Sequence, residues 1–116
     1  MKQLDVLLRQ FYALSIIAHV AHINTRVGFH HEAIGEFYDS VNQFKDRLAE
    51  YLVGKRMMNK VEVPILECNG DLLQKSAGLA SMFCEIAEEV DDEALCNMAG
   101  EFEEVVARLS YKMMMS

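Results

Sequence analysis

The four histidines of this 116-residue chain all lie between positions 19 and 31, in the stretch HVAHINTRVGFHHE. Further along, Asp46 and Glu50 are four residues apart, which places two carboxylates on one face of a helix. Imidazole nitrogens and carboxylate oxygens together form a donor set suited to Fe(II) and related divalent metals. The residue types therefore predict a metal site in which His31, Asp46 and Glu50 are joined by His19 or His22.

The helix that must position these residues is predicted over residues 29–53, where apolar side chains repeat at heptad-like spacing. A second stripe lies a third of a turn or more from the apolar face and consists of His31, Gly35, Asp39, Asn42, Asp46 and Glu50. A polar stripe is usually a solvated face. However, a glycine costs about 1 kcal/mol in an exposed helix interior, and it suits a place where another backbone comes close. We therefore interpret the stripe as a contact surface.

One helix cannot bring both ends of this stripe to one metal ion. Fifteen residues separate His31 from Asp46, which is about 22 Å along a helix axis, whereas a metal–ligand bond is about 2 Å long. A second copy packed antiparallel across a two-fold axis would place His31 of one chain beside Asp46 and Glu50 of the other. The sequence thus predicts two equal sites per dimer, in a homodimer or a higher homo-oligomer that associates through this helix, with Gly35, Asp39 and Asn42 at the interface.

Two other kinds of metal site fit the residue types less well. A zinc site made of the four histidines alone would leave Asp46 and Glu50 without a role. A di-metal site inside the bundle would need Glu-x-x-His on paired helices, and the chain contains no Glu-x-x-His.

The remaining segments are also predicted to be helical. Residues 4–25 form a helix so apolar, with Ile16, Ile17 and Val20 widening its main face, that we expect burial on more than one side. Gly54 is expected at the left-handed position that ends the second helix. An irregular stretch, residues 55–70, contains Pro64 and the turn signal Asn69-Gly70.

Two further helices complete the predicted fold. Asp71 with Gln74 three residues later is a capping box that starts the third helix, which runs to about Val90. A fourth helix follows Asp91-Asp92 and carries apolar residues as far as Met113. Residues 1–116 are therefore expected to form one all-α domain, a four-helix bundle with a longer connection between the second and third helices.

Composition restricts the partners and the compartment. The formal net charge is −7 and there is no run of lysine or arginine, so binding to nucleic acid through phosphate neutralisation is not expected. Asp5 and Arg9 interrupt what would be the apolar core of a signal peptide, and no uninterrupted apolar run is long enough for a bilayer. The three cysteines lack metal-type spacing and are interpreted as reduced thiols. These features predict a cytoplasmic protein that binds no membrane.

From His19 to Gly54 the chain resembles the Dps-like branch of the ferritin-like superfamily. The resemblance is carried by a histidine near the end of the first helix, by the pair His31-Glu32, and by Asp46-x-x-x-Glu50. It is closer still to small phage-encoded ferritin-like proteins, through HxxH at positions 19–22, Gly-Glu-Phe-Tyr-Asp at positions 35–39, the two carboxylates and Gly54. The tryptophan that usually follows the first-helix histidine is absent, and so is a basic N-terminal tail.

The resemblance implies a ferroxidase-type site shared across a two-fold interface, at which peroxide or oxygen oxidises Fe(II) to Fe(III). Zinc could substitute for iron at such a site. The missing basic tail means that shell formation and DNA binding are not implied. The alternative hypothesis is a phage-encoded interaction or structural module without catalysis, which binds a host or virion protein on a ferritin-like frame, because a fold alone does not establish an activity.

Overall fold

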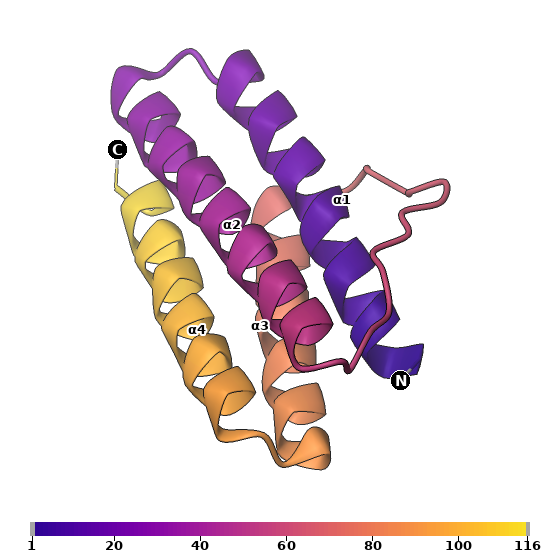
Figure 1. The fold of residues 1–116 in the computed structure, drawn as a ribbon. Helices are drawn as coiled ribbons and strands as arrows, with labels where there is room; N and C mark the ends of the chain where they lie inside the picture. The colour runs from indigo at the N-terminus through magenta and orange to yellow at the C-terminus, as the bar shows by residue number, and fades with distance from the viewer. Residues whose placement is uncertain (1, 116) are drawn as a thin grey trace.

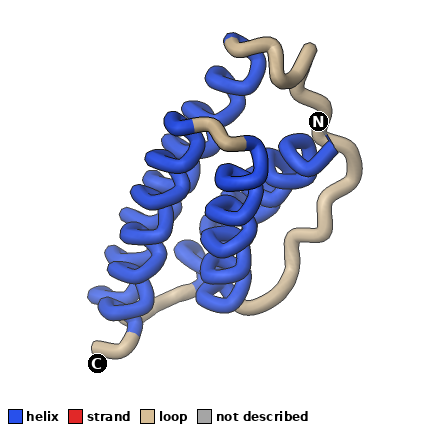
Figure 2. The backbone as a smooth tube through the Cα atoms, turned by 90° about the horizontal axis from the view of Figure 1, so that it is seen from below, coloured by secondary structure: helices blue, strands red, loops and turns tan. Residues whose placement is uncertain are grey.

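The computed structural model describes residues 2–115, and all their regular secondary structure is helical (Figure 2). The four helices are α1 (Lys2–Asn24), α2 (Gly28–Gly54), α3 (Leu72–Val90) and α4 (Glu93–Met113). The protein is an all-α four-helix bundle whose longer connection joins α2 to α3, as the sequence predicts.

The bundle consists of two antiparallel hairpins, α1–α2 and α3–α4 (Figure 1). Helix α1 packs against α2 and α3, and α4 packs against the same two helices. The connection from α2 runs back along α1, so that α3 points the same way as α2 on the opposite corner of the bundle (Figure 1). The outward face formed by α1 and α2 is therefore not covered by the other two helices.

The core is built around phenylalanine rings that link the two hairpins. The Phe11 ring on α1 lies 5.5 Å from the Phe83 ring on α3 and 4.9 Å from the Phe102 ring on α4, between centroids. Phe44 on α2 also contacts Phe102, at 5.2 Å with the rings edge to face. Such edge contacts stabilise aromatic clusters beyond the area that they bury.

The helix ends follow local backbone chemistry, and one expectation is corrected. Helix α2 continues through Gly54, and the left-handed position belongs to Arg56, with φ 58°. The N–H of Met57 bonds to the carbonyl of Leu52, and the N–H of Arg56 bonds to that of Val53. This pair of bonds is a Schellman motif, which places the left-handed residue at position 56 whatever its side chain.

The predicted start of α3 is confirmed at its cap. The Asp71 carboxylate accepts a hydrogen bond from the backbone N–H of Gln74 at 2.9 Å. Asp91 adopts the left-handed conformation after α3, and Asp92 then caps α4 by accepting from the N–H of Leu95. Aspartate tolerates a positive φ better than most residues, so two adjacent aspartates can end one helix and begin the next.

Helix α1 departs from one expectation about its burial. By length and composition it is apolar enough to cross a membrane. Core helices of folded proteins meet the same criteria, and α1 buries its main face in the bundle. Its burial is nevertheless one-sided over the second half: of the three residues expected to widen its main face, Ile17 is buried, whereas Ile16 and Val20 are about half exposed (46% and 49%).

Candidate functional site

The seam between α1 and α2 holds a ladder of polar contacts in antiparallel register. Midway along α1, the Lys45 ammonium lies over the Tyr12 ring, 5.0 Å from its centroid. One turn further along, the Ser15 hydroxyl donates to the Asn42 side-chain oxygen at 2.7 Å. The next two rungs contain histidines: His19 faces Tyr38, and His22 faces His31. The seam therefore gathers residues of the predicted site at its last two rungs.

His22 and His31 form a reciprocal pair at the end of the hairpin. The Nδ1 atom of His31 lies 2.7 Å from the carbonyl oxygen of His22, and the Nδ1 atom of His22 lies 3.0 Å from the carbonyl oxygen of His31. Their rings are stacked, 4.0 Å apart between centroids and inclined by 20°. His31 Nδ1 also lies 3.1 Å from the carbonyl oxygen of Thr25, so it contacts one carbonyl left open at the end of α1 and the carbonyl of the residue just beyond that end.

These bonds fix the position of the ring protons. A carbonyl oxygen can only accept, so Nδ1 must be the protonated nitrogen in both rings. In the neutral rings, Nε2 then carries the lone pair of each imidazole and is the atom able to bind a metal. Metal-binding histidines commonly donate their other N–H to a backbone carbonyl. His31 thus has the hydrogen bonding expected of a ligand, although capping α1 is by itself a sufficient structural reason for its position.

Gly35 is required by His22 of the same chain. A Cβ atom at position 35 would lie 2.7 Å from Cε1 and 3.0 Å from Nδ1 of the His22 ring. Contacts this short are not tolerated, so any side chain at position 35 would displace the imidazole. The sequence pattern predicted that another backbone comes close at this glycine; within the chain, the group that comes close is a side chain of α1.

The other two histidines have different surroundings. His19 is exposed on α1, and its ring lies 5.1 Å from that of Tyr38 between centroids. His30 turns away from the seam and bonds through Nε2 to the carbonyl oxygen of Met115, at 2.6 Å. His19 therefore remains accessible from outside the bundle, whereas His30 is held by the C-terminal end.

The two predicted carboxylate ligands lie far from the histidines within the chain. Asp46 and Glu50 are both exposed on α2, and the rise of an α-helix places Asp46 about 22 Å beyond His31. Among residues 2–115 no three histidine, cysteine, aspartate or glutamate side chains come close enough to hold a metal ion. One chain thus presents imidazoles at one end of the α1–α2 face and carboxylates towards the other.

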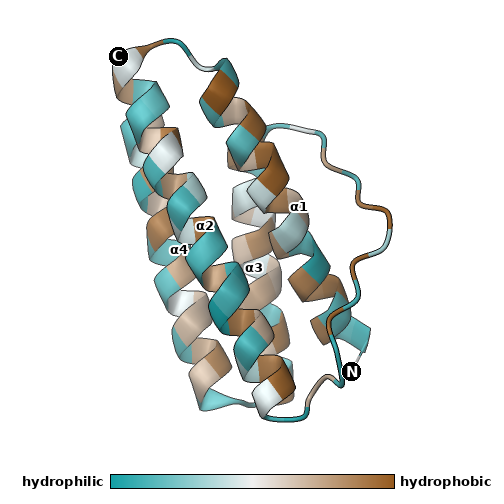
Figure 3. Ribbon diagram, turned by 45° about the horizontal axis from the view of Figure 1, so that its top comes forward, coloured by the Kyte–Doolittle hydropathy of each residue, from teal (hydrophilic) through white to brown (hydrophobic). Residues whose placement is uncertain are grey.

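The predicted interface residues divide between the seam and the surface. Gly35 and Asn42 lie in the seam, where the Asn42 oxygen accepts from both Ser15 and Lys45. Asp39 is exposed on the outer side of α2. On α1, Ile16, Val20 and Ile23 are exposed and are spaced to share one side of the helix, and Val20 also borders the end of the connection at residues 68–70. We call these three residues the α1 stripe; Figure 3 shows apolar segments along the outer side of α1 next to hydrophilic α2.

Sequence reasoning missed both the α1 stripe and the seam contacts of Ser15 and Lys45. Only their spacing could have revealed them: positions 12, 15, 19 and 22 of α1 recur every three or four residues, as do 31, 35, 38, 42 and 45 of α2. Two such rows match when the helices are placed antiparallel. The sequence instead predicted burial on more than one side of this helix, with Ile16 and Val20 widening its main face.

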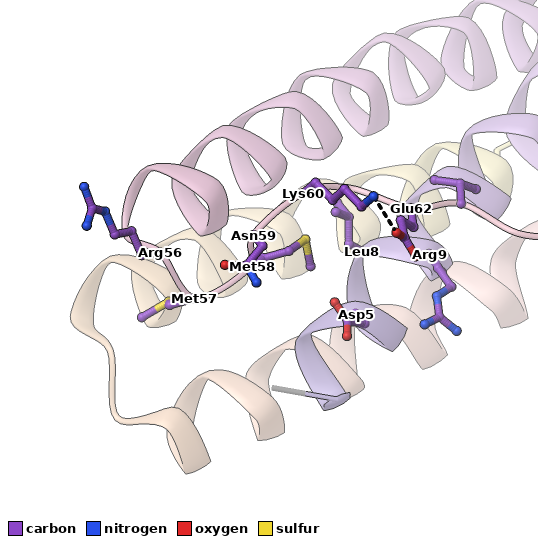
Figure 4. A pocket seen from close by; sticks show the side chains of 10 residues that line it. Asp5, Leu8, Arg9, Arg56, Met57, Met58, Asn59, Lys60 and Glu62 are labelled. Atoms are coloured by element: carbon purple, nitrogen blue, oxygen red, sulfur yellow. Dashed lines mark ion pairs between the residues drawn. The ribbon is translucent and has the colours of Figure 1, made fainter.

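A separate cavity of about 440 Å³ lies between the first turns of α1 and the start of the connection (Figure 4). Asp5, Leu8 and Arg9 line one side, and residues 56–60, 62 and 63 line the other. Lys60 and Glu62 neutralise each other in an ion pair of 3.2 Å (Figure 4). The histidines lie at the opposite end of α1, so this cavity is not part of the candidate site.

Asp92 and Cys84 have shifted pKa values, and both residues lie outside the candidate site. The N–H of Leu95 and the Tyr51 hydroxyl bond to the Asp92 carboxylate and hold its pKa below the ordinary value. Burial, with the nearby Glu103 carboxylate, raises the pKa of the Cys84 thiol. A raised pKa leaves the thiol protonated and weakly nucleophilic, which argues against thiol chemistry there.

Comparisons with protein-family models, with curated proteins and with solved structures found no match for this chain. The resemblance in the region 19–54 therefore stands on the residues themselves.

Proposed function

We propose that the protein is a homodimeric, Dps-like iron-binding protein in which α2 of one copy completes the site of the other. Each site would combine His31 and a first-helix histidine of one protomer with Asp46 and Glu50 of its partner. The substrate is Fe(II), oxidised to Fe(III). Each ferrous ion gives one electron, and two electrons with two protons reduce one hydrogen peroxide to two waters.

The separation of the donors along one face is the observation that supports this proposal. His31 and the carboxylates are about 22 Å apart within a chain, and both ends lie on or beside the uncovered α1–α2 face. An antiparallel copy of α2 would bring each histidine end against a carboxylate end. Nε2 of His31, which carries the lone pair, is the donor atom that such an arrangement requires.

The α1 stripe gives a second reason to expect a partner on this face. Ile16, Val20 and Ile23 are 46%, 49% and 62% exposed. Exposed apolar residues that adjoin one another are a common mark of an association surface. A second copy that covered α2 along its outer side would also cover these side chains, and burial of apolar area favours association by about 25 cal/mol per Å².

Two single variants that complement each other would test the shared site. His31→Asn keeps an N–H near the Nδ1 position, so the bonds to the α1 carbonyls can form, but it removes Nε2. Asp46→Ala removes a carboxylate on the exposed side of α2. In a mixed dimer, one site carries both changes and the other carries neither.

The expected result is recovery of function on mixing. After subunit exchange half of the dimers are mixed, so up to about a quarter of wild-type Fe(II) oxidation should return. The matched control mixes Asp46→Ala with Glu50→Ala: both changes fall on the same half of the site, so each site of a mixed dimer carries one change and no recovery is expected. No recovery in the His31–Asp46 mixture, with exchange demonstrated by mass spectrometry, would contradict the shared site and favour the interaction module.

A further inference from the structure

We propose that His22 is not a metal ligand but the residue that positions His31, so that His19 is the first-helix ligand of the site. This inference rests on the proposed metal site. It follows from how the His22 and His31 rings lie in the seam.

The stacked geometry prevents the two rings from sharing one ion. A metal bound to an imidazole lies close to the ring plane, about 2.1 Å from the nitrogen. The planes of His22 and His31 are nearly parallel, inclined by 20°, with centroids 4.0 Å apart. Planes so arranged meet only roughly 10 Å from the rings, far beyond a metal–nitrogen bond. A metal on His31 therefore excludes His22 as a second ligand while the stack persists.

The surroundings of His22 also suit a fixed supporting role. Its Nδ1–Cε1 edge faces the backbone of Gly35, where even a methyl group would not fit. Its N–H bonds to the carbonyl of His31 itself. Together with the bond from His31 to the carbonyl of His22, these contacts hold the His31 ring in one orientation and one tautomer.

His19 has the opposite properties. It is exposed, it lies one turn before His22 on the same side of α1, and its only ring partner in the described chain is Tyr38, at 5.1 Å. Its nitrogens can therefore approach a metal held between two copies of the α1–α2 face.

Replacing His22 with asparagine tests the roles of its two ring nitrogens independently. In His22→Asn the side-chain amide stands near the Nδ1 position, so the bond to the His31 carbonyl can form without any Nε2 lone pair. His22→Leu removes both the hydrogen bond to the His31 carbonyl and the Nε2 lone pair. The same asparagine change at His19 and at His31 provides matched variants that lose Nε2 at each proposed ligand.

Binding of Zn²⁺, used as a redox-inactive probe, is the main measurement. His22→Asn should bind within about threefold of wild type, whereas His22→Leu should weaken binding by about 10–100-fold, as loss of a supporting hydrogen bond to a ligand does. His19→Asn and His31→Asn should both bind more weakly than His22→Leu. Binding by His22→Asn as weak as that of His31→Asn, or unchanged binding by His22→Leu, would overturn the inference.

Imidazole ¹⁵N chemical shifts report the tautomer and the metal ligation of each histidine, which a change in folding stability alone does not alter. In the metal-free protein His22 and His31 should both appear as Nδ1–H tautomers. Zn²⁺ should shift Nε2 of His31 and a nitrogen of His19 while leaving Nε2 of His22 without a ligand shift. A Zn²⁺-induced chemical-shift change at a ring nitrogen of His22 would overturn this inference but not the proposed function. A wild-type protein that binds no Zn²⁺ or Fe(II) overturns the proposed function, and the positioning role with it.

Discussion

Replacing Gly35 with alanine should destabilise the protein, although the same change stabilises most helices. Inside a helix, alanine is more favourable than glycine by about 1 kcal/mol of folding free energy. At Gly35 the new methyl group would lie 2.7 Å from the His22 ring, so the ring must leave. Its departure loses a hydrogen bond of about 1 kcal/mol and an aromatic stack of about 0.5–1.5 kcal/mol. With strain added, we expect net destabilisation of about 1 kcal/mol.

The bundle contains two matched controls. Gly78 on α3 and Gly100 on α4 are exposed helical glycines, and a Cβ atom at either would meet nothing within 4 Å. Gly78→Ala and Gly100→Ala should each stabilise the protein by about 0.5–1 kcal/mol. The measurement is urea unfolding followed by circular dichroism, at one fixed protein concentration because association shifts apparent stability.

A double-mutant cycle isolates the contact itself. In a His22→Ala background the methyl group at position 35 has room, so Gly35→Ala should become stabilising like the two controls. The coupling free energy between positions 22 and 35 should then be about 1–2 kcal/mol. If Gly35→Ala stabilises the wild-type protein as much as Gly78→Ala does, His22 does not pack on Gly35 and the reasoning about the pair fails.

Three further predictions concern the core, a helix cap and charge. Phe102→Ala should lower the free energy of unfolding by about 3–5 kcal/mol in the same assay, because its fully buried ring contacts three other phenylalanines. Asp92→Ala should lower the free energy of unfolding by about 1 kcal/mol near neutral pH, because the N-cap of α4 is lost. Because the folded pKa of Asp92 is lowered, its contribution is present above its unfolded pKa, about 3.9, and is lost as the pH falls through the folded pKa. The variant should therefore lose less stability than wild type on acidification below about pH 4; equal losses would contradict this. Finally, micromolar protein should not shift duplex DNA in a gel at physiological salt, and a salt-sensitive shift would refute the charge argument.

The bundle could be predicted from the sequence because helical periodicity, caps and turn residues agree along most of the chain. The boundaries of α3 and α4 follow directly from apolar spacing with Asp71, Asp91 and Asp92 as end signals. The end of α2 was less predictable, because a Schellman motif depends on backbone hydrogen bonds and can place a non-glycine residue such as Arg56 in the left-handed position.

The site was predicted only in part, for a physical reason. Spacing identifies which residues share a face of α2, and it predicted a close approach at Gly35. It does not identify the approaching group, since the fit of the His22 ring against α2 depends on the distance and register between two helices. Likewise, Ile16 and Val20 look like core residues in sequence, and only the packing of α1 against two neighbours leaves them exposed.

The distribution of contacts between the two hairpins has a consequence for how the chain could be divided. The phenylalanine contacts all link one hairpin to the other, whereas the α1–α2 seam adds mainly hydrogen bonds and a histidine stack. Each hairpin alone would leave its aromatic rings in water, so peptides 1–54 and 71–116 should be unfolded separately. Mixed together, they should reassemble a helical complex without the connection, since the connection supplies none of these ring contacts. Cleavage within residues 55–70 would thus turn one folded chain into an obligate two-piece assembly.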